Sequence, residues 1–305
     1  MSTEPAAAPQ TRCGFVALVG APNAGKSTLL NALVGTKVSI VTHKAQTTRA
    51  QIRGVVTEGA NQIVFIDTPG IFAPKRRLDR AMVDAAWTGA GDADLVAFIV
   101  DAEKGITPEI ESLLKGLADI PHPKLLVLNK IDLMRREKLL AISEALNAAL
   151  RFEATFMISA LTGDGVGQFL DWTAAHIPYG PWHFPEDQLT DLTLALTAAE
   201  VTREKLFLRI HDEIPYNTTV ETEKFTINKD GSYRIDQVVY VTRDTHKKII
   251  LGAGGQTIKT IGAEARAELM EIFEVPVHLF LFVKVREKWG EDPERYREMG
   301  LDFPR

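Results

Sequence analysis

The sequence has very little cysteine and no long hydrophobic run. Cys13 is the one cysteine in 305 residues, so an intrachain disulfide and the small disulfide-stapled class of protein are excluded. The longest apolar runs, Leu95–Val100 and Val275–Val285, are too short or too interrupted by polar residues to span a bilayer. The 45% hydrophobic and 25% charged residues are ordinary for a globular protein and exclude a collagenous or disordered chain.

The chain also lacks a large excess of either sign of charge, and its N-terminus lacks a secretion signal. The formal net charge is −5, which by itself argues against a nucleic-acid partner, although an average can hide a local basic patch. Residues 1–12 contain no basic start followed by an apolar stretch, and we expect them to form a disordered tail. At roughly 150 residues per domain, the length indicates about two domains.

The first two-thirds of the chain alternates short apolar runs with amphipathic stretches. The expected helices include Thr107–Leu117 and Arg136–Leu150, and the expected strands are Phe15–Val19, Gln51–Thr57, Gln62–Asp67, Leu95–Asp101, Lys124–Asn129 and Ala154–Ile158. Repeated strand–helix–strand order predicts an α/β fold with a doubly wound, mostly parallel sheet covered on both faces. We place this domain at 13–178, with Gln51–Thr57 pairing with Gln62–Asp67 across a turn.

A second, differently built domain follows a break in composition. The segment IPYGPWHFP at Ile177–Pro185 is too rich in proline and glycine for regular structure, so we place a linker at 179–189. The α+β domain expected at 190–288 has a helix at Thr190–Lys205, strands at Thr218–Ile227 and Tyr233–Thr242, a short helix, a glycine loop, a helix at Gln256–Phe273 and a strand at Val277–Val285. From Glu287 onward the chain is polar, and we expect a weakly structured tail at 289–305.

A phosphate-binding loop lies directly after the first predicted strand. Gly20-Ala-Pro-Asn-Ala-Gly-Lys26-Ser27 matches G-x-x-x-x-G-K-[ST], in the strand–loop–helix context that supports the motif. The glycines let backbone N–H groups approach phosphates, and the helix N-terminus adds positive potential. Lys26 is suited to reach the β- and γ-phosphates and Ser27 to ligate Mg²⁺. The alternative, a chance glycine-rich turn, does not explain the flanking strand and helix.

Three further motifs each follow a predicted strand. In Asp67-Thr-Pro-Gly70, the aspartate is placed to hold Mg²⁺ through water and the glycine N–H to reach the γ-phosphate. In Asn129-Lys-Ile-Asp132, the carboxylate of Asp132 can accept two N–H bonds from guanine, which adenine cannot offer, while the Lys130 stem covers the ring. In Ser159-Ala160-Leu161, the N–H of Ala160 is placed for guanine O6. Each motif alone has a plain structural alternative as a turn.

Residues 14–178 resemble the GTPase domain of the translation-factor-related P-loop GTPases. That resemblance implies that Thr48 ligates Mg²⁺ in the GTP state with Thr47 beside it, and the sequence does not choose between the two. The position that holds a water-orienting glutamine in many small GTPases is Ile71 here. By resemblance to the subgroup with a hydrophobic residue there, Asn23 and Thr47 are expected to help bind K⁺, which would stabilise transition-state charge; a turn role is the alternative for Asn23.

These motifs define the expected nucleotide and metal sites. We assign catalysis to Lys26, Asn23, Thr48 and Gly70, with slow hydrolysis accelerated by K⁺. Mg²⁺ is expected on Ser27, Thr48 and Asp67. The expected contacts to GTP or GDP are Gly20, Asn23, Ala24, Gly25, Lys26, Ser27, Thr28, Asp67, Gly70, Asn129, Lys130, Asp132, Ser159, Ala160 and Leu161.

A second glycine loop, in the second domain, has a basic setting. Gly252-Ala253-Gly254-Gly255 is a GxxG turn between two helix-like segments, which lets backbone N–H groups clamp about four nucleotides. From Arg243 to Lys259 there are four basic residues and one acidic residue. The RNA contacts we expect are Arg243, Lys247, Lys248, Gly252, Ala253, Gly254, Gly255 and Lys259. The string alone is weak because glycine pairs are common in loops, but the strand and helix order resembles a type II KH domain. The variable pair Ala253-Gly254 lacks the lysine that such loops often carry.

A P-loop GTPase followed by a KH domain resembles the Era family of bacterial ribosome-assembly GTPases, from about Arg12 to Trp289. Further matches are Val38–Val41, Gln46–Arg49 and Tyr233–Asp236. The resemblance implies binding to the 3′ end of 16S rRNA and to the 30S subunit, and a peripheral association with the inner face of the cell membrane, for which the sequence holds no lipidation motif or amphipathic anchor. We expect a cytoplasmic monomer.

In this interpretation GTP orders switch I (about Thr36–Arg53) and switch II (about Pro69–Arg80), and RNA and GTP favour each other by linkage. Two alternatives stay open. One is an NTPase whose second domain binds protein, and the other is an RNA-binding scaffold that holds GTP without turnover.

Overall fold

The chain forms two compact units that do not follow its linear order. The computed structural model describes residues 11–44, 47–211 and 213–304. The first unit holds the chain up to Thr36, Gln51–Phe72 and Ala86–Asp191, and the second holds Lys37–Ala50, Ala73–Ala85 and the chain from Leu192 on. Two short segments from within the predicted first domain therefore belong to the second unit. Residues 1–10 of the tail expected at 1–12, and Gln46, lie outside the described residues. The expected tail is too long at its end, because Arg12 already belongs to the first strand, where it pairs with Asn61.

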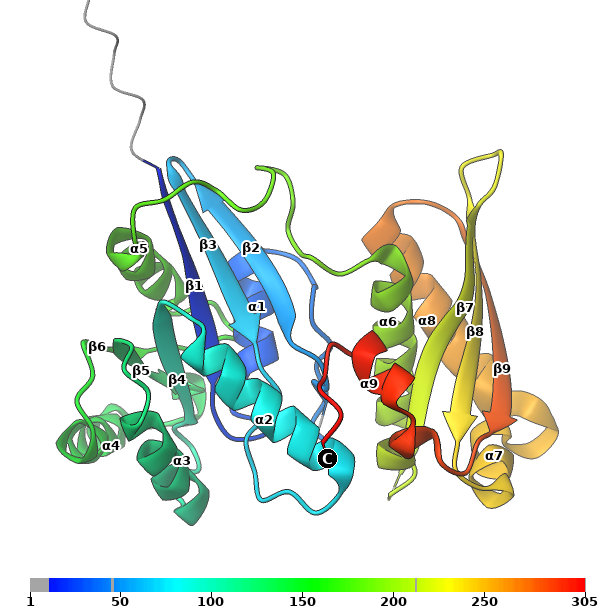
Figure 1. Cartoon of the computed structure of the whole chain (residues 1–305), viewed down its shortest axis with the longest axis horizontal. Helices are drawn as coiled ribbons and strands as arrows, with labels where there is room; N and C mark the ends of the chain where they lie inside the picture. Colours follow the sequence, from blue (N-terminus) through cyan, green and yellow to red (C-terminus); the bar gives the residue numbers. More distant parts are fainter. Residues whose placement is uncertain (1–10, 45–46, 212, 305) are drawn as a thin grey trace, which may run out of the picture. The chain divides into compact units, whose positions relative to one another are not determined.

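The first unit is built on a six-stranded sheet in the order β2-β3-β1-β4-β5-β6 (Figure 1). All neighbouring strands are parallel except β2 and β3, which form the antiparallel pair expected from the sequence. Every residue of β4 is buried, as a strand covered on both faces requires. The strands are β1 (Arg12–Val19), β2 (Ile52–Glu58), β3 (Asn61–Asp67), β4 (Leu95–Asp101), β5 (Lys124–Asn129) and β6 (Ala154–Met157).

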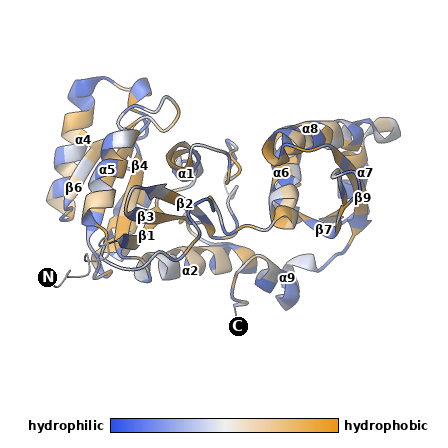
Figure 2. Ribbon diagram, turned by 90° about the horizontal axis from the view of Figure 1, so that it is seen from above, coloured by the Kyte–Doolittle hydropathy of each residue, from blue (hydrophilic) through white to orange (hydrophobic). Residues whose placement is uncertain are grey.

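Helices cover both faces of this sheet, with α1 and α2 on opposite sides (Figure 2). Helix α3 shows why they form: Thr107 caps its N-terminus by accepting from the N–H of Ile110, Pro108 occupies the first turn, and four apolar side chains at helical spacing are buried. The predicted α/β class is confirmed. The helices are α1 (Lys26–Val34), α2 (Arg77–Gly91), α3 (Pro108–Ala118), α4 (Arg136–Ala149) and α5 (Val166–His176).

The segment expected to be a linker is bonded along the edge of the first unit. The buried amide of Gln62 accepts from the N–H groups of His183 and Phe184 at 2.9 and 3.0 Å and donates to the Phe184 carbonyl at 2.8 Å. Arg53 forms an ion pair with Asp191 at 2.9 Å. Proline does prevent regular structure here, but polar side chains on β2 and β3 hold the irregular backbone.

The second unit has a three-stranded sheet in the order β7-β8-β9, with β7 antiparallel and β9 parallel to β8. Helices α6 and α8 supply its core with Val201, Leu206, Ile261 and Leu269. Helix α6 begins four residues later than expected, because Thr193 caps it by accepting from the N–H of Leu196. The elements are α6 (Leu194–Arg209), β7 (Thr218–Ile227), β8 (Tyr233–Val241), α7 (Asp244–Leu251), α8 (Gln256–Phe273) and β9 (Val277–Val285).

The expectation of a weakly structured C-terminal tail is wrong. A short helix, α9 (Pro293–Glu298), follows β9 and is capped by Asp292. Tyr296 is fully buried, its ring lies 4.9 Å from that of Phe303, and its hydroxyl donates to the carbonyl of Gly290 at 2.7 Å. Trp289 is also buried and donates to the carbonyl of Asn217 at 3.0 Å. Scattered aromatic residues anchor this otherwise polar segment. No helix in the described part of the chain is long and apolar enough to cross a membrane.

Candidate nucleotide and RNA sites

The phosphate loop is preformed around a buried lysine. It joins β1 to α1, and Gly25 adopts φ +98° immediately before the helix, a conformation that favours glycine. Lys26 is 5% exposed and its Nζ donates to the carbonyls of Gly20 and Ala21, both at 3.1 Å. Burial lowers the pKa of Lys26 to about 8, opposed by the nearby charge of Asp67. Asn23 has φ +63°, which asparagine tolerates better than most residues.

Ser27 and Asp67 lie together beside this loop. The Ser27 hydroxyl donates to Oδ2 of Asp67 at 2.6 Å, and Asp67 is fully buried. Hydroxyl and carboxylate oxygens are the ligand types that Mg²⁺ prefers, so these two residues fit the predicted metal. Among the described residues, no group of three or more His, Cys, Asp and Glu is arranged to hold a metal ion. Ser27 and Asp67 can therefore supply only part of the ligands of Mg²⁺, and phosphate and water oxygens would supply the rest.

The Asp67–Gly70 motif packs directly against the phosphate loop. A Cβ on Gly70 would lie 2.8 Å from Cα of Pro22 and 2.9 Å from its nitrogen, so only glycine allows this backbone approach. The N–H of Ile71 donates to the carbonyl of Gly20 at 3.2 Å, and its side chain is 7% exposed. The apolar side chain is thus in the core and does not replace the water-orienting glutamine.

Asn129 ties three motifs together. Its Nδ2 donates to the carbonyl of Ala24 at 2.9 Å, and its Oδ1 accepts from the N–H groups of Lys130 at 2.8 Å and Ala160 at 3.0 Å. The side chain is so close to Gly25 that a Cβ there would lie 2.1 Å from its Nδ2. The sequence predicts Asn129 as a nucleotide contact. It does not show that the side chain also holds neighbouring loops together, because that depends on how close the loops lie in space.

The residues predicted for the base come together at the ends of β5 and β6. Asp132 is exposed in a short 3₁₀ turn, and Lys130 has φ +67° with its Nζ 2.6 Å from Asp101. Ser159 is buried, and Leu161 is 80% exposed. The N–H of Ala160, predicted to face guanine O6, donates to Asn129 instead. The carboxylate of Asp132, the group predicted to accept from guanine, is thus on the exposed side of this set.

The predicted switch I threonines lie in the second unit, whereas the other expected nucleotide residues belong to the first. Thr48 is 6% exposed. The hydroxyl of Thr47 lies 2.6 Å from that of Thr42 and donates to the carbonyl of Lys44 at 2.8 Å. The structure therefore does not choose between Thr47 and Thr48 as the metal ligand.

The second glycine loop connects α7 to α8. Gly252, Gly254 and Gly255 have φ of +71°, +59° and +78°. A Cβ on Gly252 would lie 2.1 Å from Oγ1 of Thr257, whereas Gly254 and Gly255 face open space. Helix α8 begins at Gln256 without a side-chain cap, so its first N–H groups are oriented toward the exposed loop.

Basic side chains surround this loop. Arg243, Lys248 and Lys259 are exposed, and Lys247 is half-buried. Among the isoleucines near the loop, Ile249 is 50% exposed, whereas Ile250 and Ile261 are fully buried in the core. A basic, glycine-rich helix junction with one exposed isoleucine is suited to an RNA backbone and one or two bases.

Comparison with known proteins agrees with both sites. Residues 15–130 match the family model described as a 50S ribosome-binding GTPase, and residues 213–290 match the KH domain model. GTPase Era of Rhizobium meliloti (strain 1021) is 62% identical over 98% of this chain and 96% of its own length, and that of Bradyrhizobium sp. (strain BTAi1 / ATCC BAA-1182) is 60% identical over the full length of both.

The chain belongs to the Era family of GTPases. The crystal structure of Era in complex with MgGDPNP and nucleotides 1506–1542 of 16S ribosomal RNA matches with a TM-score of 0.90 and 37% identity over 95% of this chain and 99% of that one. The crystal structure of a single-residue variant of Aquifex aeolicus Era bound to GDP·AlF4⁻ matches to the same extent. The predicted Era resemblance, the GTPase domain and the KH domain are confirmed.

The buried lysine of this Era family member predicts pH-dependent nucleotide binding. Phosphate favours the protonated amine, and the pKa of Lys26 near 8 means that binding must take up a proton above that pH. We expect the Kd for GDP to be nearly constant below about pH 7 and to rise toward about tenfold per unit above pH 8, measured by titration calorimetry.

The Lys26→Arg variant is the control, because its guanidinium stays charged throughout this range. It should bind GDP more weakly but without the lysine's pH dependence. Any pH dependence of the Kd that remains in this variant comes from ionisation of the guanine ring of GDP. A wild-type curve parallel to that of the variant would contradict the assignment.

Proposed function

We propose that this protein is a GTP-hydrolysing switch that binds 16S rRNA near its 3′ end through its KH domain and assists assembly of the 30S subunit. One observation carries the proposal: a formed phosphate loop and a formed GxxG loop occur in the same chain, within a full-length match to Era bound to MgGDPNP and 16S rRNA nucleotides. The phosphate loop alone would support a nucleotide-binding protein, and the GxxG loop alone an RNA-binding protein. Together they support a protein that binds both nucleotide and RNA.

The residues at the phosphate loop divide the work of GTP binding. Lys26 is placed to contact the β- and γ-phosphates, and the N–H of Gly70 to meet the γ-phosphate. Asp132 selects guanine. Ser27, Asp67 and a switch I threonine would hold Mg²⁺, which neutralises charge on the transferred phosphoryl group when bound. Asn129 keeps the loops at fixed separations, so little reorganisation is needed during reaction.

Slow hydrolysis stimulated by K⁺ is part of the proposal. Ile71 is buried against the phosphate loop, so the usual glutamine function is absent from that position. Asn23, held with φ +63° in the loop, is our candidate K⁺ ligand together with Thr47. A monovalent cation there would supply positive charge to the transition state as an arginine finger does.

Three further expectations rest on the family resemblance and are kept as proposals. The protein acts as a monomer, it works in the cytoplasm, and it associates peripherally with the inner face of the cell membrane. None of them enters the arguments about the two sites.

We expect GTP turnover to be slow and to depend on the monovalent cation. Steady-state phosphate release should rise about tenfold or more when Na⁺ is replaced by K⁺ at constant ionic strength, because one well-placed charge is typically worth that much in the transition state. Equal rates in the two salts would contradict the K⁺ site. Loss of turnover in Lys26→Ala guards against a contaminating GTPase, and no turnover at all would favour the non-enzymatic scaffold.

The GxxG loop gives a matched test of RNA binding. Asp and Asn both tolerate the left-handed backbone of Gly254, and its Cβ position is open. We expect Gly254→Asp to weaken binding of an RNA covering nucleotides 1506–1542 of 16S rRNA by about tenfold or more, since it sets a carboxylate against phosphate.

The nearly isosteric Gly254→Asn should bind within about threefold of wild type in the same filter-binding assay. If both variants bind as wild type does, the RNA site lies elsewhere. If the wild-type protein does not bind this RNA, the second domain serves another partner.

A further inference from the structure

Helix α6 has two different faces. On one face, apolar side chains enter the core of the second unit against α8 and the sheet. On another, a charged stripe runs at spacings of three and four residues, which places its members on one side of a helix. Arg203 and Glu204 in this stripe are only 2% and 3% exposed. The stripe consists of Glu200, Arg203 and Glu204, and the aromatic Phe207 follows them on the same side of the helix.

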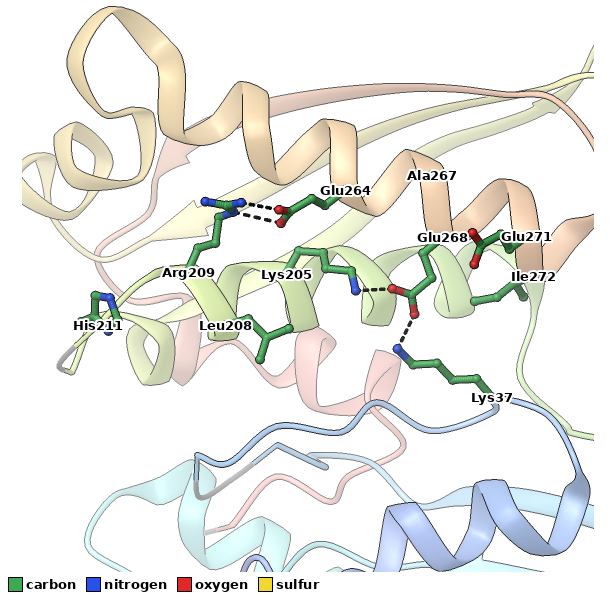
Figure 3. A pocket seen from close by; sticks show the side chains of 10 residues that line it. All are labelled: Lys37, Lys205, Leu208, Arg209, His211, Glu264, Ala267, Glu268, Glu271 and Ile272. Carbon is green, nitrogen blue, oxygen red and sulfur yellow. Dashed lines mark hydrogen bonds and ion pairs between the residues drawn. The ribbon is translucent and has the colours of Figure 1, made fainter. Parts of the chain in front are cut away.

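The first part of switch I supplies partners for this stripe. One oxygen of Glu204 accepts from Nζ of Lys37 at 2.6 Å, and the other accepts from the backbone N–H of Val41 at 2.8 Å. Lys37 also bonds to Glu268 on α8 (Figure 3). Lys44 donates to the carbonyls of Phe207 and Ile210 at the C-terminal end of α6, where a cation is favoured by the helix dipole.

The second part of switch I is held in the same way. Arg203 donates to the carbonyl of Thr47 at 2.5 Å. The guanidinium of Arg49, whose residue is 3% exposed, donates to the carbonyls of Thr218 at 2.7 Å and Pro215 at 3.1 Å. Switch I is therefore bonded to α6 or to the turn after it both before residues 45–46 and after them. These bonds include one to the backbone carbonyl of Thr47.

We propose that α6 of the KH-containing unit positions switch I for GTP hydrolysis, with Glu204 and Arg203 as positioning residues. This inference rests on the proposed function, in which Thr47 and Thr48 supply cation ligands. A loop that is already ordered loses less conformational entropy when those ligands are needed. Removing Glu204 takes the carboxylate partner from the N–H of Val41 and leaves Lys37 with Glu268 as its remaining carboxylate. A buried polar group that loses its partner is costly, so this part of the loop is held less firmly.

This arrangement gives a structural reason for GTP hydrolysis to depend on RNA binding. The helix that orders the catalytic loop is built into the same core as α8, at whose N-terminus the GxxG loop lies. RNA bound at that loop can thus act on a helix that also carries the anchor of switch I.

The groove between α6 and α8, about 870 Å³ in volume, offers a matched control. In it, Lys205 bonds to Glu268, and Arg209 pairs with Glu264 with its Nε at 2.9 Å (Figure 3). Although burial alone would raise the pKa of Glu268, bonds from Lys205 and Lys37 lower it below its usual value. Among the described residues Glu264 pairs with Arg209 on α6, so its loss changes the groove without removing a partner of switch I.

The test compares Glu204→Ala, Glu204→Gln and Glu264→Gln in the full-length protein. Hydrogen exchange should show faster exchange of the Val41 amide, by about tenfold or more, in Glu204→Ala. In Glu204→Gln the amide oxygen still accepts from Val41, so protection should largely return. In steady-state assays we expect kcat for GTP to fall at least about fivefold in Glu204→Ala and to recover partly in Glu204→Gln. In Glu264→Gln, kcat should stay at the wild-type value. The Kd for GDP should change less than about twofold in all three variants.

An unchanged or increased kcat in Glu204→Ala, with wild-type turnover present, would overturn the inference while leaving the proposed function intact. Absence of turnover in wild type would instead remove the proposed function, and Val41 exchange would still report whether Glu204 anchors the loop. Should Glu204→Ala fail to fold, Lys37→Met tests the same bond from the half-exposed loop side. It should lower kcat by about threefold or more, and wild-type kcat in that variant would equally overturn the inference.

Discussion

The nucleotide site depends on one buried amide. Asn129 donates to the carbonyl of Ala24 and accepts from the N–H groups of Lys130 and Ala160. Parallel strands bring their carboxyl ends to one edge of the sheet, but they do not fix the separations of the loops that follow. The side chain of Asn129 does so by filling the space beside Gly25. Lys26, Ser27, Asp67 and Asp132 thus extend from loops whose separations the fold itself fixes.

The second unit holds switch I through side-chain contacts and not through a frame of strands. Switch I is not part of the frame around Asn129 but is bonded to α6 through Glu204, Arg203 and the helix carbonyls. A loop that depends on side-chain partners is released more easily than one braced by strands. The stable frame is therefore suited to binding and the anchored loop to regulation, which is the division that a nucleotide switch needs.

Much of this arrangement could be predicted from the sequence. Periodicity located β4, β5, β7, α8 and β9 to the residue, and the phosphate loop and GxxG loop were evident because their chemistry needs specific residues at fixed spacing. What could not be predicted depends on distance in space. Asn129 bonds to Ala24 across 105 residues, and Gln62 holds the supposed linker at Phe184 across 122.

Two further features show the same limit. The C-terminal segment is polar by composition, yet Tyr296 is fully buried. Local pairs with Glu200 and Lys205 do not by themselves predict that Arg203 and Glu204 are buried, because other partners of these charges, Thr47 and Lys37, lie more than 150 residues earlier. Local patterns thus placed the residues of the two sites but not the long-range contacts within each unit that support them.

We expect nucleotide and RNA binding to be linked in this chain. The most direct test measures the Kd for an RNA covering nucleotides 1506–1542 of 16S rRNA with the protein saturated in turn by Mg-GDP and by a non-hydrolysable Mg-GTP analogue. RNA should bind more tightly with the analogue, by about fivefold or more, and the same factor should appear when nucleotide affinities are compared with and without RNA. Equal RNA affinity in the two nucleotide states would show that the two sites are not linked.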